Sequence, residues 1–270
     1  MTDVFKQKHP SVLYIEKWME QHPQLIAGFS TRNGGYSPQP YDSLNLGLHV
    51  QDDKELVYKN RQRLSEMIDV PITNWVCSEQ VHGTRIKVVS GEDRGKGIKN
   101  MKTALQGYDG MITGEKNILC TAYFADCVPL FYFDTKRKYV GIAHAGWKGT
   151  VNQVAGKMVE RFQQLGTHLE HLSVAIGPCI SDVNYEVDER VISQIDPRFQ
   201  TSQVIKKVND RYLLNLKQLN VEILLQSGVL RHNIDVTRFC TYEDHHLFFS
   251  HRRDGGKTGR MLGFIGLFSR

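Results

Sequence analysis

Long apolar runs and a regular cysteine pattern are both missing from this sequence. No stretch approaches the roughly 18 consecutive apolar residues that a membrane-spanning helix requires, so we expect no membrane partner. The five cysteines are odd in number and scattered, without a C-x2-C pair, which argues against a disulfide framework and a common structural zinc site. The first residues also lack the apolar core of a signal peptide. These features predict a cytoplasmic protein with free thiols.

Charge of one sign is not concentrated in this chain either. The net charge is +5 with a pI of about 8.9, and the longest run of Lys and Arg is Lys136-Arg137-Lys138 in a predicted turn. This pattern gives little support for nucleic-acid binding, so we expect no nucleic-acid partner. No internal repeat, low-complexity tract or linker divides the 270 residues. The simplest prediction is one domain, either a monomer or a homodimer.

The centre of the chain predicts a β-hairpin whose ends carry reactive side chains. Two apolar runs, 128–133 and 139–143, flank a short polar turn. Cys127 directly precedes the first run, and His144 directly follows the second. A glycine-bracketed turn then leads to a helical pattern over 150–165, and the free N–H groups at such a helix start suit an anion.

Periodicity predicts further elements on both sides of this hairpin. We expect strands at 25–31, 41–50, 75–80, 84–89, 172–180, 234–239, 247–250 and 261–268. We expect helices at 53–68, 186–195 and 215–226, with aspartate and asparagine caps at the first and last of these.

Three distant side chains at predicted strand breaks, His82, Cys127 and His144, are candidate metal ligands. Three protein ligands with a fourth position open are typical of catalytic zinc, and two histidines with one cysteine also match a blue copper centre. A complete copper oxidase needs further histidine-rich sites, and the eleven histidines include no His-x-His pair. A third interpretation is a cysteine hydrolase with Cys127 as nucleophile and a histidine as base.

Seven strings closely resemble the YfiH/YlmD family, once called laccase-domain proteins. In chain order they are GFSTRNGG at 28–35, SLNLG at 43–47, QVHG at 80–83, ADCVPL at 125–130, HAGWKGT at 144–150, IGPCI at 176–180 and FFSHRRDG at 248–255. The resemblance implies an α+β fold over 1–270, a single domain of mixed β-sheets packed together with helices on the outside. Residues 1–24 are expected to be an N-terminal extension packed on it.

The resemblance also implies a catalytic zinc held by His82, Cys127 and His144, with Cu²⁺ as an alternative ion. The implied reaction is purine nucleoside phosphorolysis of adenosine, inosine and S-methyl-5′-thioadenosine, with phosphate as the second substrate, giving free base and ribose 1-phosphate or its methylthio analogue. Adenosine deamination is an implied companion activity, for which the open position on zinc would account. The alternative functions are a peptidoglycan precursor editing hydrolase and, less favoured, a copper-dependent polyphenol oxidase.

Six residues in or beside the matching strings are expected to bind substrate: Arg32, Asn45, Lys148, Cys179, Arg252 and Arg253. Two positions depart from the family pattern, which usually has arginine in place of Lys148 and an aromatic in place of His251. Lysine keeps the charge but loses the bidentate fork of a guanidinium. Glu79 and His251 are candidates for proton transfer, whereas Asp126 is expected to be structural because adjacent strand residues face opposite ways.

Overall fold

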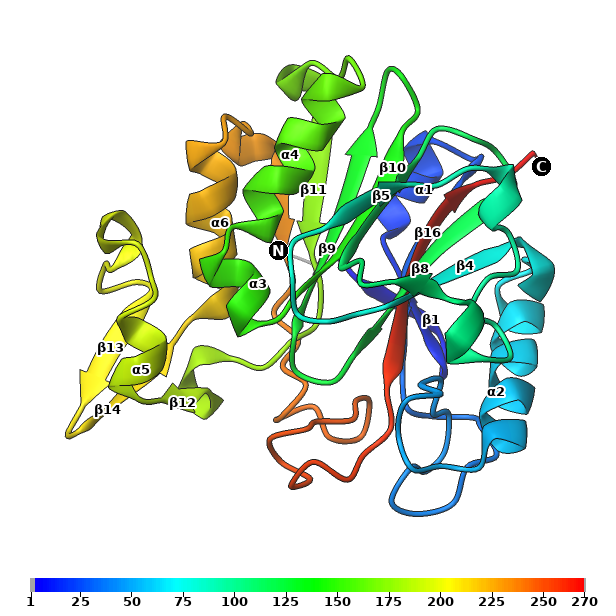
Figure 1. Ribbon diagram of the computed structural model, residues 1–270, viewed down its shortest axis with the longest axis horizontal. Helices are drawn as coiled ribbons and strands as arrows, with labels where there is room; N and C mark the ends of the chain where they lie inside the picture. The colour runs from blue at the N-terminus through cyan, green and yellow to red at the C-terminus, as the bar shows by residue number, and fades with distance from the viewer. Residues whose placement is uncertain (1–2, 270) are drawn as a thin grey trace.

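Two large β-sheets pack face to face in the computed structural model, which describes residues 3–269 (Figure 1). The seven-stranded sheet has the order β1 (Lys6–His9), β2 (Val12–Tyr14), β3 (Leu25–Ser30), β16 (Met261–Leu267), β8 (Ile118–Phe124), β4 (Trp75–Glu79) and β6 (Leu105–Gln106). The six-stranded sheet has the order β15 (Ile234–Val236), β11 (Leu172–Ile176), β9 (Val128–Asp134), β10 (Val140–Ala145), β7 (Gly110–Thr113) and β5 (Ile86–Val88). A small third sheet contains β12 (Glu186–Val187), β14 (Arg211–Leu214) and β13 (Ile205–Val208).

Helices cover the outer faces of the two large sheets (Figure 1). The α-helices are α1 (Glu16–Gln21), α2 (Lys54–Met67), α3 (Trp147–Val151), α4 (Val154–Gln164), α5 (Glu189–Ile192) and α6 (Leu216–Gln226). Short 3-10 helices occur at Ile72–Asn74, Gly91–Asp93, Met101–Thr103, Leu169–His171, Asp182–Asn184, Pro197–Phe199 and Arg231–Asn233. The predicted caps of α2 and α6 are confirmed, since the Asp53 and Asn215 side chains accept N–H groups of their first turns.

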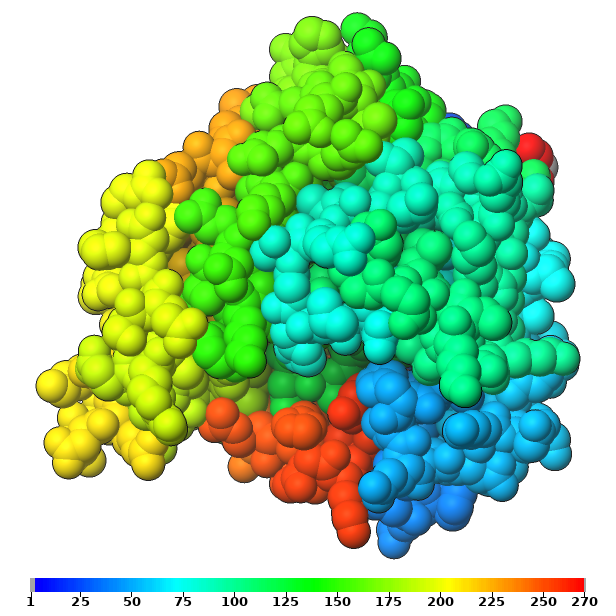
Figure 2. Space-filling model, in the orientation of Figure 1, coloured from blue at the N-terminus to red at the C-terminus, as the bar shows by residue number. Residues whose placement is uncertain are grey.

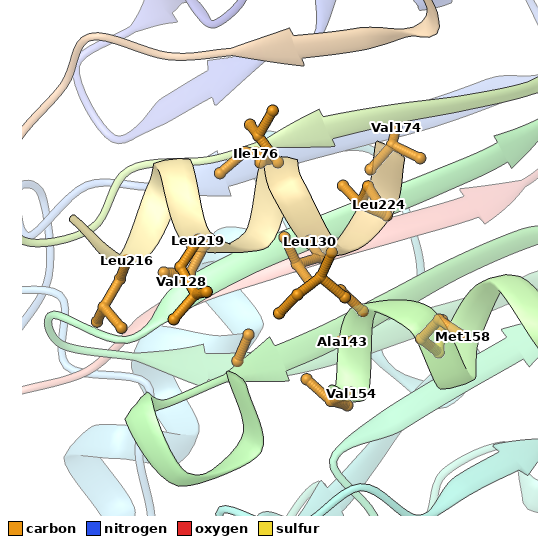
Figure 3. Close-up of a cluster of buried hydrophobic side chains, with 14 of the residues drawn as sticks. Val128, Leu130, Ala143, Val154, Met158, Val174, Ile176, Leu216, Leu219 and Leu224 are labelled. Atoms are coloured by element: carbon orange, nitrogen blue, oxygen red, sulfur yellow. The ribbon is translucent and has the colours of Figure 1, made fainter. Parts of the chain in front are cut away.

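Side chains of the central strands alternate between two layers of the core. On β9, Val128, Leu130 and Tyr132 belong to the outer layer beneath α4 and α6, of which Figure 3 shows part. Phe131 and Phe133 point the opposite way, into the layer between the two sheets. Because both faces of β9 are buried, its sequence is continuously apolar rather than alternating. Burial of each such side chain contributes about 1.5–3 kcal/mol.

The hairpin predicted at the centre of the chain is confirmed as β9 and β10. The two strands pair antiparallel, with His144 opposite Pro129 near the open end. At the turn, Asp134 Oδ1 accepts the N–H groups of Lys136 and Arg137 at 2.9 and 2.8 Å. The register fixed by this turn places His144 at the end of the hairpin where Cys127 enters.

The α+β fold of a single domain with mixed sheets packed together and helices outside is confirmed. The segment 1–24, expected as an extension, lies partly inside the sheet, because β2 pairs with β3 and Leu13, Ile15 and Trp18 enter the inner core. Residues 1 and 2 of that segment lie outside the described residues. Among the described helices, none combines the length and apolar character needed to cross a membrane.

The strand predicted at 41–50 is wrong. The segment consists of turns, although Leu44 and Leu46 are buried as the alternation suggested. Side chains of α2 donate hydrogen bonds to the backbone carbonyls that would otherwise pair with a neighbouring strand. Asn60 donates to Asn45 O at 2.9 Å, and Arg61 donates to Leu46 O at 2.9 Å.

Three other predicted elements differ from the structure. The helix at 150–165 is two helices, α3 and α4, because Gln153 between them adopts φ = 61°. The helix at 186–195 is shortened to α5 by strand β12. The strand at 247–250 is absent, since Arg253 takes the carbonyl of Phe248 at 2.9 Å.

Candidate metal centre

The three candidate ligands come together where the chain passes between the two large sheets. His82 lies between β4 of one sheet and β5 of the other, with φ = 58°. Cys127 lies between β8 and β9, which also belong to different sheets. His144 lies near the end of β10. The β4–β5 connection, the β8–β9 connection and the end of β10 meet at one place between the two large sheets. Residues far apart in sequence therefore share one site.

The ligand atoms of His82, Cys127 and His144 lie within 4.8 Å of one another. His82 Nε2 and Cys127 Sγ are 3.9 Å apart, and the two imidazole rings have centroids 4.7 Å apart. In a tetrahedral zinc site, with zinc–sulfur and zinc–nitrogen bonds of about 2.3 and 2.0 Å, the ligand atoms lie at distances from one another similar to those found here. Within residues 3–269 this is the one group of three or more His, Cys, Asp or Glu side chains whose ligand atoms lie close enough together to hold a metal ion. The geometry and donor types of this cluster therefore fit one metal ion.

Asp109, just before β7, holds two of the three candidate ligands. Its Oδ1 lies 2.8 Å from Nδ1 of His144, which leaves Nε2 of that ring for a ligand. The same carboxylate accepts the N–H groups of Val81, His82 and Gly83 at 3.1, 3.0 and 2.7 Å. A carboxylate on the far nitrogen of a ligating histidine is the usual support of a metal site, because it fixes the tautomer and the ring.

Electrostatics in the metal-free cluster favour a thiolate and an imidazolium. Burial raises the pKa of the Cys127 thiol, but the charge and hydrogen bond of His144 and the hydrogen bond of His82 outweigh it and lower the pKa to about 6. Burial lowers the pKa of His144, but Cys127 and Asp109 outweigh it and raise the pKa to about 9. Metal binding would displace the His144 proton and use the thiolate directly.

Gly146 allows the ligands to approach one another. A Cβ atom at this position would lie 2.6 Å from Cδ2 of His82 and 3.2 Å from Sγ of Cys127. The first contact is shorter than real side chains show and the second is tighter than most, so a larger residue would push the His82 ring out of place. The glycine is also the N-cap of α3, which links the cluster to that helix.

A cavity of about 650 Å³ opens in front of the cluster. Figure 2 shows the surface hollowed where the segments coloured cyan, green, red and blue meet. One group of lining residues is aromatic or apolar: Ala125, Trp147, Ile180, Tyr185 and Leu216. A second group is polar or charged: His49, Glu79, Gln80, His251 and Arg260. The volume suits a small ligand of nucleoside size together with an anion.

Two of the six expected substrate-binding residues, Lys148 and Arg252, line this cavity. The Lys148 ammonium lies 5.6 Å from the ring centroid of Trp147. Arg252 Nη1 donates to Glu186 O at 2.9 Å, and its guanidinium lies 5.0 Å from the Tyr185 ring. Both side chains are exposed, and both are accessible to a ligand in the cavity.

The other four, Arg32, Asn45, Cys179 and Arg253, lie outside the cavity lining and make internal contacts. Arg32 pairs with Asp42 at 3.2 Å, and Asn45 Oδ1 accepts the N–H group of Arg260 at 2.9 Å.

Cys179 and Arg253 are likewise committed to the interior. Cys179 is fully buried, and burial raises its pKa to about 12. Arg253 donates to Thr241 O, Tyr242 O and Phe248 O and pairs with Asp254. The contacts of Arg253 join neighbouring loops, and its donors are therefore not free for a ligand.

Sequence reasoning missed Asp109, His49 and Arg260. Asp109 lies in a Tyr-Asp-Gly sequence just before a strand. This pattern is typical of an ordinary turn and gives no sign of a role at the site. No expected element or matching string includes Arg260, and His49 falls in the strand expected at 41–50. Asp126, expected to be structural, lines the cavity, and its two oxygens accept hydrogen bonds from Thr241 and from the Arg252 N–H group at 2.6 and 2.7 Å.

Fold and cluster together define a mixed α/β single-domain protein with a cavity-facing His–Cys–His centre. The family model described as multi-copper polyphenol oxidoreductase laccase matches residues 26–268. The chain therefore belongs to this laccase-like YfiH/YlmD family.

Curated relatives and solved structures match nearly the whole chain. Purine nucleoside phosphorylase YlmD of Bacillus subtilis is 42% identical over 269 residues, covering 97% of each chain. The protein of the same name from Geobacillus stearothermophilus is 44% identical, covering 98% of each. The crystal structure of a Bacillus licheniformis hypothetical protein YfiH has a TM-score of 0.95 at 41% identity, covering 98% of this chain and all of that one.

Proposed function

We propose that this chain is a zinc-dependent purine nucleoside phosphorylase. Its substrates would be adenosine, inosine and S-methyl-5′-thioadenosine, and its products free base and ribose 1-phosphate or the methylthio analogue. The observation that carries the proposal is the His82–Cys127–His144 cluster opening into a cavity with aromatic walls and cationic side chains that form no ion pair within residues 3–269. The names of the relatives from Bacillus and Geobacillus support the same reaction.

Zinc would be held by Nε2 of His82, Sγ of Cys127 and Nε2 of His144. Mixed nitrogen and sulfur donors suit the borderline softness of this ion, and the cavity leaves one side of the cluster open to a ligand. When bound, zinc would supply a Lewis acid beside the reacting groups. Asp109 would keep both histidines in their ligating orientation.

Phosphorolysis breaks the bond between C1′ of the ribose and a purine nitrogen, and forms a new bond from C1′ to a phosphate oxygen. The electron pair of the broken bond leaves with the purine, which must then gain a proton or an equivalent charge. Trp147 and Tyr185 offer aromatic faces for the purine. Cationic side chains in the cavity, Lys148, Arg252 and Arg260, offer positions for the phosphate.

Glu79 and His251 are the candidates for protonating the leaving purine, because both line the cavity. Asp126 also lines the cavity but is less suited to this step, since Thr241 and the Arg252 N–H group each donate a hydrogen bond to one of its oxygens. Adenosine deaminase activity would use the same cavity, with one of these groups moving a proton between the attacking water and the departing ammonia.

Two other functions are distinguished by what they require. A peptidoglycan precursor hydrolase would turn over muropeptides without phosphate. A copper-dependent polyphenol oxidase of the multi-copper kind needs several copper sites, whereas the described residues form one such cluster. The aromatic walls and the size of the cavity suit a nucleoside better than a muropeptide, and the cationic side chains of the cavity suit phosphate better than a phenol.

The deciding experiment measures base release from inosine with and without phosphate, together with zinc content of the same preparation. We expect about one zinc per chain and hypoxanthine release that depends on phosphate and yields ribose 1-phosphate. Cys127→Ala should remove both metal and activity. Release of base at the same rate without phosphate would exclude a phosphorylase.

A further inference from the structure

Arg260 lies on the wall of the cavity that is formed by the segment before β16 and the loop between β3 and α2. In Figure 1 this loop lies on the opposite side of the molecule from α5, α6 and β12. Arg260 Nη1 donates to Thr258 O and Gly259 O at 2.8 and 2.9 Å. Its stem lies against Gly47, where a Cβ atom would be 2.7 Å from the arginine Cγ. The guanidinium is therefore held in place by its own loop.

Positive charge at this wall has no matching carboxylate. In the described part of the chain, neither Arg260 nor the neighbouring Arg61 forms an ion pair. Arg61 is fully buried and donates to the carbonyls of Leu46, Gly97 and Ile98, and its Nη2 has no partner. Its guanidinium lies 5.0 Å from the ring of Tyr123, which lines the cavity. Buried positive charge without a counter-ion favours an anionic ligand.

Two acidic groups near this wall attract Arg260 but form no ion pair with it within residues 3–269. Cys127 and Asp126 act on Arg260 only through space, and the oxygens of Asp126 are already bonded to Thr241 and to the N–H group of Arg252. Glu79 lines the same cavity but makes no ion pair with either arginine. Nη2 and Nε of Arg260 have no partner within residues 3–269, so two donors of the planar fork remain for a ligand.

The two other cations of the cavity are less suited to a fixed anion. Lys148 is an exposed ammonium, a point charge on a flexible stem beside Trp147. Arg252 is exposed too, and it is engaged with Glu186 O and the Tyr185 ring. Arg260 combines partial burial, fixed orientation and free donors, which makes a charge-assisted bond at this position stronger.

His49 adds a neutral donor beside Arg260. It lines the cavity and packs edge-on against Tyr123, with ring centroids 5.7 Å apart. The His49 side chain is exposed to the cavity. Desolvation by the surrounding protein is the main cause that lowers its pKa, and the positive charges of Arg260 and Arg61 lower it further, to about 4. An uncharged imidazole can donate one hydrogen bond to an anion without adding charge.

We infer that Arg260, with His49 beside it and Arg61 behind it, forms the seat for inorganic phosphate. This inference rests on the proposed phosphorylase function and adds an orientation to it. Phosphate would lie at the Arg260 wall, and the purine would lie toward Trp147 and Tyr185 in the other part of the cavity. The ribose would then lie between them, beside the cluster.

The kinetic test compares Arg260→Gln with wild type at varied phosphate and varied inosine. We expect KM for phosphate to rise about ten- to hundredfold, as for loss of a charge-assisted bidentate contact, and KM for inosine to stay within about twofold. Arg260→Lys should show a smaller rise. Arg238→Gln, an exposed arginine outside the cavity, is the matched control and should be unchanged. An unchanged KM for phosphate, or a rise in KM for inosine alone, would overturn the inference.

A binding test separates this inference from the proposed function. Inorganic phosphate is titrated calorimetrically into zinc-loaded wild type and Arg260→Gln, after zinc content and melting temperature have been checked. Phosphate binding should be detectable in wild type. In Arg260→Gln its Kd should rise by the same factor as the KM for phosphate. If wild type releases base without phosphate, the phosphorylase proposal fails, but phosphate binding lost in Arg260→Gln still upholds an anion seat. No phosphate binding to wild type overturns the seat. If Arg260→Gln does not fold, Arg260→Lys and His49→Ala are tested by the same criteria.

Discussion

The Oδ1 atom of Asp109 lies 2.8 Å from Nδ1 of His144 and also accepts the N–H group of His82 at 3.0 Å. One carboxylate therefore positions two of the three candidate ligands, although it is not a ligand itself. This relationship connects a short turn before β7 to the crossing between β4 and β5 and to the end of β10.

Asp109→Asn should weaken metal binding by about 10- to 100-fold, because the imidazole loses the carboxylate that fixes its orientation. The measurement is competition for zinc with a chromogenic chelator. Asp210→Asn, at an exposed position in the β13–β14 turn, is the matched control. Unchanged zinc affinity in Asp109→Asn, with the fold intact by circular dichroism, would contradict the supporting role.

Gly146→Ala should also lower zinc occupancy, for a steric reason. The added methyl group would lie 2.6 Å from Cδ2 of His82 and 3.2 Å from Sγ of Cys127, so at least one ligand must move. We expect less than half the zinc content of wild type after dialysis against free metal, measured by atomic emission. Gly91→Ala, where the nearest atoms lie at 3.4 Å, is the control that should keep full occupancy. Full zinc content in Gly146→Ala would show that the ligands can shift without loss.

The sequence predicts those parts of the fold that depend on local pattern. Residues 128–145 form the predicted hairpin because a continuous apolar sequence, a polar turn and an Asx-type contact at Asp134 all favour the same structure. The strands expected at 41–50 and 247–250 are absent because their carbonyls bond to the side chains of Asn60, Arg61 and Arg253. Asn60 and Arg61 bond to carbonyls 15 positions away, whereas Arg253 bonds to one 5 positions away, and neither kind of contact leaves a periodic signal in the sequence.

The site is predictable to a similar extent. His82, Cys127 and His144 were found because each is a potential ligand at a strand break and because the strings around them resemble a family. Asp109 and Arg260 were missed, because their roles depend on which loops meet at the edge of the sheets. Arg253 shows the opposite case, a cation in a basic loop whose donors are satisfied by nearby carbonyls.

Arg253→Gln should destabilise the protein rather than selectively weaken phosphate binding. The guanidinium joins the carbonyls of Thr241, Tyr242 and Phe248 to the carboxylate of Asp254, and their loss should cost about 2–4 kcal/mol of unfolding free energy. The measurement is chemical denaturation, with Arg238→Gln as control. An unchanged unfolding midpoint together with a raised KM for phosphate would instead place Arg253 at the ligand.

Alkylation of Cys127 should have a pH dependence that reveals its neighbours. In zinc-free protein the contacts with His144 and His82 lower its pKa to about 6 against the effect of burial, so the thiolate is already formed at neutral pH. The rate of iodoacetamide labelling should be nearly flat between about pH 7 and 8, and should fall about tenfold per unit well below 6 as the thiolate is protonated. An ordinary thiol, with a pKa near 8.5, would instead speed up several-fold between about pH 7 and 8.

Zinc should protect Cys127 from the same reagent, because the sulfur would then be bonded to the metal. Mass spectrometry of the labelled peptides separates this thiol from Cys120 and Cys179, which are buried with pKa values raised to about 12 and serve as internal controls. A labelling rate that climbs steeply from pH 7 to 8 would show that His144 does not stabilise the thiolate. Equal labelling with and without zinc would show that Cys127 is not a ligand. Protection together with the flat profile would show that Cys127 is a ligand and that its thiolate is already stabilised before zinc binds.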